Sequence, residues 1–205
     1  MQKGNAILTM MVSYQKTEYM PIENQFIMPE APPPESLMNI EHLLRTLLSR
    51  SDLSDSRRDY VTKVLAQEMP IEIKPVDPFI YYKMVPGTAP RALLWMRVRG
   101  NIDENDRNLH RCACAYISDI ALLRTALVPY PNFKMTFAAS LDHSMWFHSP
   151  FRADEWMLYE CESPRLVANR GLIHGRVWKR DGTLAVSVAQ EALIRGQIDN
   201  KTSKL

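Results

Sequence analysis

The sequence is poor in cysteine, in net charge and in long hydrophobic segments, and each shortage excludes a class of protein. Its 205 residues hold three cysteines, at positions 112, 114 and 161, without a disulfide framework or a metal-ligand spacing, so a reducing compartment fits best. The 25 basic and 23 acidic residues are spread without runs and leave a net charge of +2, so a nucleic-acid partner is not expected. No segment approaches the ~20 apolar residues of a membrane span.

Several common catalytic and targeting motifs are also missing. No Gly-x-Ser-x-Gly elbow exposes a serine, and the histidines lack the spacing of metal ligands, so neither a metal nor another cofactor is expected. His143 and His148 near Ser144 invite a comparison with serine hydrolases, but packing or hydrogen bonding within a strand explains them better. Residues 6–12 are apolar but short, contain Thr9 and follow no basic region, so they do not resemble a secretory signal.

The first third of the chain reads as a strand, a linker and two helices. A turn at residues 3–5 precedes an apolar stretch at 6–14 that predicts a strand, although no local partner for it exists. Five prolines between residues 20 and 35 remove backbone donors and indicate an extended connector. Apolar residues at helical spacing then predict two short amphipathic helices, at 36–49 and 55–67.

From residue 70 onwards the pattern indicates one α+β domain. Period-two alternation predicts strands at 71–74 and 92–98, and a long helix follows, with apolar residues at three- and four-residue steps between 109 and 127. Apolar residues on its other sides suggest a helix that is buried nearly all round. Further strands are predicted at 133–141, with apolar residues at the odd-numbered positions, at 155–163, and at 171–179 and 183–195 around an Asp-Gly turn. At 46% hydrophobic residues, the chain has enough for one core plus a small addition.

Three polar residues interrupt these apolar patterns. Asp119 lies beside the apolar stripe of the long helix, where a carboxylate is hydrogen-bonded, paired, functional or turned to solvent at the stripe's edge. Gln190 interrupts the apolar face of the last strand and needs partners for its amide, which backbone groups of a core would also provide. Ser140 lies on the strand parity opposite to the apolar residues, so it meets Asp119 only if that face looks at the helix or a bulge re-aims it.

Longer motifs identify a family resemblance. The runs SLDHSMWFH (140–148), PFRADEW (150–156), MLYEC (157–161) and RGLIHG (170–175), with Asp119 before them and Gln190 after them, resemble the acyl-coenzyme A thioesterase II family over nearly the whole chain. The resemblance implies an α+β hot-dog fold, in which an antiparallel sheet wraps a long buried helix. Members of this family carry two hot-dog domains in tandem.

The resemblance also divides the chain. Residues 1–17 resemble the closing strand of a first hot-dog domain whose remainder is absent from this sequence, and 18–69 are the Pro-rich linker with two short helices. Residues 70–196 match a complete C-terminal hot-dog thioesterase domain. Residues 197–205 form a polar tail that ends in Ser203, Lys204 and Leu205, a tripeptide of the kind that a peroxisomal import receptor binds.

The catalytic residues implied by the resemblance are Asp119, Ser140 and Gln190, which together hold and activate a water molecule. The expected reaction is hydrolysis of fatty acyl-coenzyme A to a free fatty acid and coenzyme A in the peroxisomal matrix, as part of fatty-acid metabolism. The expected partners are the acyl-coenzyme A substrate, the import receptor and, as a further possibility, a second copy of the chain. The alternative is a truncated form with impaired catalysis that acts only as a folded interaction subunit. A hot-dog hydratase fits less well, because no histidine lies close to Asp119 in sequence.

Overall fold

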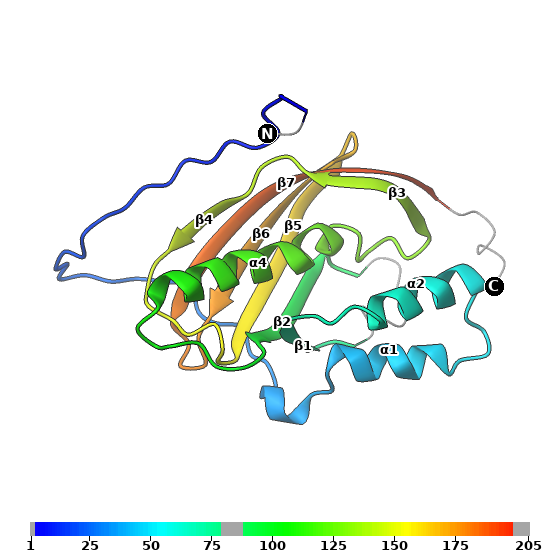
Figure 1. The fold of residues 1–205 in the computed structure, drawn as a ribbon, viewed down its shortest axis with the longest axis horizontal. Helices are drawn as coiled ribbons and strands as arrows, with labels where there is room; N and C mark the ends of the chain where they lie inside the picture. The colour runs from blue at the N-terminus through cyan, green and yellow to red at the C-terminus, as the bar shows by residue number, and fades with distance from the viewer. Residues whose placement is uncertain (1–2, 79–87, 199–205) are drawn as a thin grey trace.

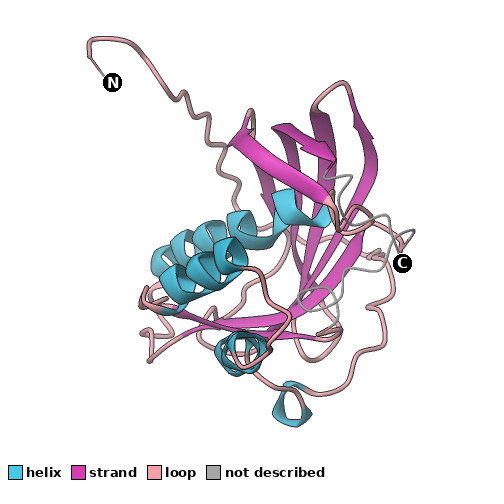
Figure 2. Cartoon of the chain, turned by 90° about the vertical axis from the view of Figure 1, so that its right-hand side faces the viewer, coloured by secondary structure: helices cyan, strands magenta, loops and turns pink. Residues whose placement is uncertain are grey.

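A computed structural model describes residues 3–78 and 88–198 (Figure 1). Its helices are η1 (Pro34–Ser36), α1 (Ile40–Leu48), α2 (Asp55–Leu65) and α4 (Arg107–Thr125), and its strands are β1 (Ile71–Pro75), β2 (Arg91–Val98), β3 (Phe133–Ser140), β4 (Ser144–Phe147), β5 (Met157–Val167), β6 (Arg170–Trp178) and β7 (Leu184–Ile198). The strands form one antiparallel sheet in the order β1-β2-β5-β6-β7-β3, and β4 also pairs with β7. Figure 2 shows how this sheet curves. The fold is the predicted α+β hot-dog arrangement, and no described helix is long and apolar enough to cross a membrane.

Strand β7 is the longest strand and organises the sheet. It pairs with β6 along one edge and with β3 and then β4 along the other. Its alternation places Val186, Val188, Ala192 and Ile194 in the core. The predicted Asp-Gly turn joins β6 to β7, with Gly182 at a φ of 85° that suits glycine.

Helix α4 crosses the concave face of the sheet (Figure 1). The side chain of Asp106 caps it by accepting a hydrogen bond from the N–H of Leu109 at 2.9 Å. The core side of the helix carries Cys114, Ile117, Ala121 and Leu122, all buried.

The other side of α4 is not buried, so our expectation of a helix buried nearly all round was wrong. Leu109 and Tyr116, which belong to the predicted apolar stripe, are 48% and 52% exposed. Periodicity identifies apolar faces but not which of two faces meets the sheet. The buried face of α4 is the one that uses smaller residues, which let the helix approach the sheet closely.

The convex side of the sheet is covered by the linker. Trp95, Trp156, Leu158 and Trp178 form a second hydrophobic cluster there, and Met28, Ala31 and Leu37 of the linker pack on it. The indole N–H of Trp95 donates to the carbonyl of Pro32 at 2.9 Å. The later part of the proline-rich segment, from Met28 onwards, therefore packs against the sheet as part of the domain.

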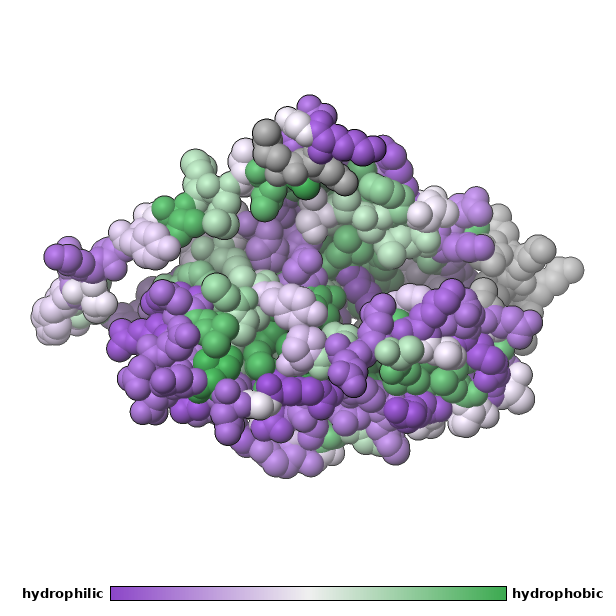
Figure 3. Space-filling model, viewed as in Figure 1, coloured by the Kyte–Doolittle hydropathy of each residue, from purple (hydrophilic) through white to green (hydrophobic). Residues whose placement is uncertain are grey.

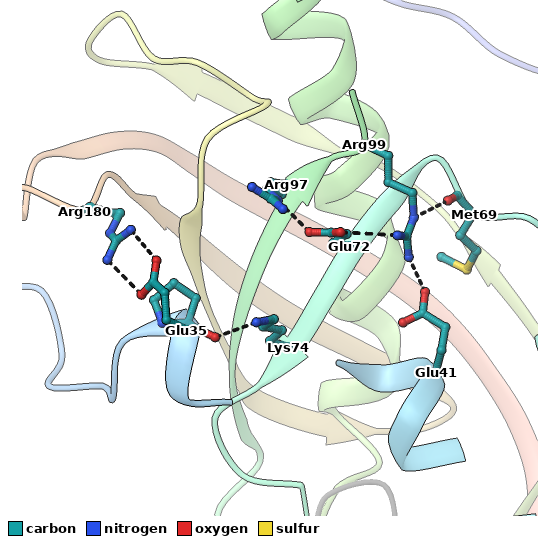
Figure 4. Close-up of polar contacts among 9 residues, drawn as sticks. Glu35, Glu41, Met69, Glu72, Lys74, Arg97, Arg99 and Arg180 are labelled. Carbon is teal, nitrogen blue, oxygen red and sulfur yellow. Dashed lines mark hydrogen bonds and ion pairs between the residues drawn. The ribbon is translucent and has the colours of Figure 1, made fainter. Parts of the chain in front are cut away.

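Charged side chains fasten the same layer (Figure 4). Glu72 on β1 pairs with both Arg97 and Arg99 on β2, and Arg99 also pairs with Glu41 at the start of α1. A separate pair joins Arg180, at the β6–β7 turn, to Glu35 of the linker. Arg97 and Arg99 are therefore occupied by carboxylates on the side of the sheet opposite α4.

Residues 6–14 form no strand, contrary to our expectation. They are exposed, and the isolated bridge at Asn5 is the nearest pairing that the described chain shows. A strand needs a neighbour for its backbone hydrogen bonds, and Figure 1 shows this segment extending away from the sheet. That residues 1–17 close another hot-dog domain stays a prediction, as do the other proposed domain limits.

Candidate active site

The three residues singled out from the sequence lie in hydrogen-bond contact. The hydroxyl of Ser140, at the end of β3, donates to Oδ1 of Asp119 on α4, with 3.4 Å between the oxygens. The amide nitrogen of Gln190, on β7, donates to the same hydroxyl oxygen at 2.7 Å. One carboxylate, one hydroxyl and one amide thus converge from a helix and two strands.

A bulge at Thr136 turns Ser140 toward the helix. Met135 pairs with Gly196 and Phe137 pairs with Arg195, so Thr136 is an extra residue in β3. After the bulge, Ser140 pairs with Ala192, whose side chain is buried in the core. Of the two ways left open for Ser140 to meet Asp119, the structure therefore shows the bulge: the extra residue exchanges the two faces of β3 midway.

A second irregularity separates β3 from β4, so residues 140–148 are not one continuous strand. Ser140 pairs with Ala192 and Ser144 with Ala189, which leaves three residues opposite two. The N–H of Leu141 donates to the carbonyl of Glu191 at 2.8 Å and holds the extra residue in place. In return, the side chain of Asp142 accepts a hydrogen bond from the N–H of Glu191 at 2.9 Å.

This second bulge brings His143 into the site. Nδ1 of His143 lies 2.7 Å from Oε1 of Gln190, and Nε2 lies 2.8 Å from the hydroxyl of Ser118 on α4. His143 was expected to serve packing or hydrogen bonding within the strand, and Ser118 was not singled out. Their closeness in sequence to Asp119 and Ser140 does not reveal the contact, because the bulge that brings them together is not visible in a local pattern.

The five polar side chains connect the core to the surface. Gln190 and Ser118 are completely buried, whereas Asp119 and Ser140 are exposed. Asp119 therefore lies at the exposed edge of the helix, one of the two positions that the sequence left open. The neighbouring helix surface is apolar, with Leu109 and Tyr116 about half exposed, and Figure 3 shows hydrophobic residues open to solvent on this face of the molecule.

Buried groups beneath α4 have raised pKa values and keep their protons near neutral pH. The hydroxyl of Tyr159, on β5, donates to the carbonyl of Ser118 at 2.8 Å, and burial raises the pKa of this phenol well above its ordinary value. Burial also raises the pKa of Cys114 to about 12 and that of Cys161 still further, so both thiols stay protonated near neutral pH. The described cysteines of the core are thus unsuited to nucleophilic chemistry.

Other candidates from the sequence lie apart from this site. His148 contacts the hydroxyl of Ser187 at 2.8 Å, on the face of β7 that points away from α4. Within residues 3–78 and 88–198, no three histidine, cysteine or acidic side chains are grouped to hold a metal ion. Ser203, Lys204 and Leu205 lie outside the described residues.

Comparison with known proteins places the chain in a family. A family model described as the acyl-CoA thioesterase C-terminal domain matches residues 57–194. An acyl-coenzyme A thioesterase 8 of Mus musculus is 49% identical over all 205 residues, which correspond to 64% of that relative's length. The crystal structure of an acyl-CoA thioesterase II from Mycobacterium marinum is 32% identical, with a TM-score of 0.63 over 88% of this chain and 60% of that one.

A more distant structure supports the fold alone. A protein from Alicyclobacillus acidocaldarius, described as having a hot dog fold, shares 12% identity and a TM-score of 0.59 over 89% of this chain. The described sheet and helix agree with that architecture. On the match of residues 57–194, the chain belongs to the family of the acyl-CoA thioesterase C-terminal domain.

Proposed function

We propose that the chain hydrolyses fatty acyl-coenzyme A to a free fatty acid and coenzyme A, with Asp119 as the general base. The observation that carries this proposal is the contact of Ser140 with both Asp119 and Gln190. Asp119 is exposed, so water and substrate can reach its carboxylate. The relatives named as acyl-CoA thioesterases support the substrate class.

The proposed reaction uses one water molecule and regenerates the site. Asp119 accepts a proton from water as the oxygen attacks the thioester carbonyl, and a tetrahedral intermediate forms. The carbon–sulfur bond then breaks, and the departing thiolate of coenzyme A takes the proton back from Asp119. Ser140, held by the amide of Gln190, keeps its hydroxyl beside the carboxylate and orients the water.

The test of this function is thiol release from acyl-coenzyme A of medium and long chain length. The variant Asp119→Asn keeps the shape of the side chain but removes the base, and we expect its kcat to fall about 100- to 10,000-fold. Asp59→Asn is the matched control, because Asp59 is an exposed helical aspartate that pairs with Lys63 within α2. Equal rates for the wild-type chain and Asp119→Asn would contradict the role of Asp119.

We also propose that the apolar face beside the site pairs with a second copy of the chain. Leu109 and Tyr116 on the outer side of α4 are 48% and 52% exposed. An apolar surface of this kind favours association, and it lies on the helix that carries Asp119. A sedimentation series should show dimers, and Tyr116→Glu should return them to monomers.

The same surface supports a second candidate, a folded interaction subunit without activity. It is favoured by the exposure of Asp119 and Ser140. The chain spans 64% of the length of the relative from Mus musculus. The two candidates separate on one result. Thiol release that Asp119→Asn abolishes selects the enzyme, and a well-folded dimer without thiol release selects the subunit.

For localisation, we propose the peroxisomal matrix. The support is the tripeptide Ser203, Lys204, Leu205, which is the type of C-terminal signal that a soluble receptor binds. A fluorescent protein fused in front of the chain should colocalise with a peroxisomal marker. Removal of the last three residues should leave it outside, and import without them would contradict the proposal.

A further inference from the structure

The polar chain of the site begins and ends on adjacent residues of α4. It runs from Ser118 through His143, Gln190 and Ser140 to Asp119, with oxygen or nitrogen separations of 2.8, 2.7, 2.7 and 3.4 Å. These hydrogen bonds therefore start at Ser118 on α4, pass along the edge of β7 that pairs with β3 and β4, and end at Asp119, the next residue of α4. The proposed function assigns roles to Asp119, Ser140 and Gln190. It assigns none to the other two residues of the network, His143 and Ser118.

The amide of Gln190 determines which groups donate in this network of hydrogen bonds. Its nitrogen donates to Ser140, so its oxygen faces His143 and only accepts. Nδ1 of His143 must then carry the hydrogen. In a neutral imidazole Nε2 is then left as an acceptor, and it lies 2.8 Å from the hydroxyl of Ser118.

The reverse arrangement has a consequence for catalysis. If His143 carried its hydrogen on Nε2, Nδ1 would accept, and the amide of Gln190 would turn its nitrogen toward the histidine. The amide oxygen would then face Ser140 and take its only hydroxyl hydrogen. Asp119 would lose the hydrogen bond from Ser140, so the tautomer of His143 decides where that hydrogen points.

Ser118 is placed to favour the first arrangement. Its side chain is completely buried, and its hydroxyl also lies 2.8 Å from the carbonyl of Ala115 and 3.6 Å from the sulfur of Met145. A hydroxyl has one hydrogen. When Ser118 gives it to Nε2 of His143, the carbonyl of Ala115 still accepts from the helix backbone, so neither acceptor is left without a donor.

We propose that His143, supported by Ser118, is a positioning residue that orients the amide of Gln190 and thereby points the hydroxyl hydrogen of Ser140 at Asp119. The proposal rests on the proposed function for its catalytic meaning. The tautomer itself is a property of the folded chain and is measurable without substrate.

The first test reads the tautomer by nitrogen NMR of the ¹⁵N-labelled full chain. We expect the ring of His143 to carry hydrogen on Nδ1, and Asp119→Asn to leave this unchanged because Asp119 lies at the far end of the network. Ser118→Ala, which removes the partner of Nε2, should shift the population toward the other tautomer. A wild-type ring that carries hydrogen on Nε2 alone would overturn the proposal.

The second test compares two substitutions of His143 by the rate of thiol release. His143→Leu removes both ring nitrogens, and we expect kcat to fall about 10- to 100-fold with KM within about 3-fold of wild type. His143→Asn places an amide N–H near the position of Nδ1, so it should recover at least about 5-fold of the lost kcat. His148→Leu is the matched control, because it makes the same replacement at a histidine that contacts Ser187 outside the network.

The outcomes separate the two proposals. A His143→Leu variant that keeps the kcat of wild type, or one that falls no further than His143→Asn, overturns the positioning role while hydrolysis by Asp119 stands. If the wild-type chain releases no thiol, the proposed function fails. The NMR result then still decides whether His143 orients Gln190.

Discussion

The hydroxyl of Tyr159 donates to the carbonyl of Ser118 at 2.8 Å and joins β5 to α4 beside the residue that precedes Asp119. Space for the phenol exists because Gly175, on the neighbouring strand β6, has no side chain. A Cβ atom at residue 175 would lie 2.6 Å from the ring and the hydroxyl of Tyr159. The position of α4, which carries Asp119, thus depends on a glycine two strands away from Ser140.

Gly175→Ala should destabilise the fold and lower activity together. The added methyl cannot be accommodated without moving a fully buried ring, and such overpacking typically costs about 1–3 kcal/mol. Chemical denaturation and thiol release measure the two effects. Gly171→Ala is the control, because a Cβ there would meet its neighbours at 3.4 Å, and equal losses in both variants would contradict the role assigned to Tyr159.

Ser140 should be replaceable by threonine but not by alanine. Threonine keeps a hydroxyl between Gln190 and Asp119, and the exposed position leaves room for its methyl group. Alanine removes the link and leaves the buried amide of Gln190 without its acceptor, so kcat should fall about 10- to 1,000-fold. Steady-state kinetics of the two variants would refute the role of Ser140 if alanine were as active as threonine.

Asp154 should make stability depend on acid pH. Its carboxylate accepts from Arg152 and from the N–H of Ile102, at the loop that leads into α4, and these bonds lower its pKa to about 2. A carboxylate whose pKa is lowered by folding stabilises the fold above its ordinary value of 3.8, and this contribution disappears as pH falls toward 2. Wild type should therefore lose stability between about pH 4 and 2 through this group.

Asp154→Asn isolates that contribution. At pH 7 the variant should be less stable than wild type by roughly 1–2 kcal/mol, and the difference should vanish near pH 2. Thermal unfolding at pH 7, 4, 3 and 2 provides the measurement. A difference that stays constant over the whole series would show that Asp154 does not titrate as proposed.

The linker should resist proteolysis from Gln25 onwards and not before. The side chain of Gln25 donates to the carbonyl of Gly182 and accepts from the N–H of Leu184, so the protected segment begins there. Brief trypsin treatment should cut after the exposed Lys16 and leave a product that is stable to further cleavage. Mass spectrometry identifies the cut, and Trp95→Phe, which removes the bond to Pro32, should expose the linker to proteinase K.

The order of helices and strands was predictable because local patterns determine it. The Asp-Gly turn, the capping Asp106 and the alternation of β7 all appear in the sequence at the places where the structure uses them. Hydrophobic period alone did not decide the orientation of α4, because both of its faces carry apolar residues. Which face of α4 is buried depends on the surface of the sheet against which the helix packs, and that surface is formed by residues distant in sequence.

The contact among Asp119, Ser140 and Gln190 was expected from family resemblance and not from spacing. Two bulges decide it: one at Thr136 turns Ser140 to the helix, and the one after Ser140 brings in His143. Bulges depend on pairing with residues about 50 positions later in β7, so no local pattern reveals them. For this reason His143 and Ser118 escaped the sequence analysis.

The pairing of β7 with β6, β3 and β4 also determines when the site forms during folding. Gln190 reaches Ser140 and His143 only after the last strand has joined partners on both of its edges, one of them distant in sequence. Such sequence-distant pairing is a slow step of folding, and a slip of one residue would turn Gln190 to the opposite face. The contact of Gln190 with Ser140 and His143 should therefore be among the last of the sheet to form, and a nascent chain lacks the proposed site until β7 has paired.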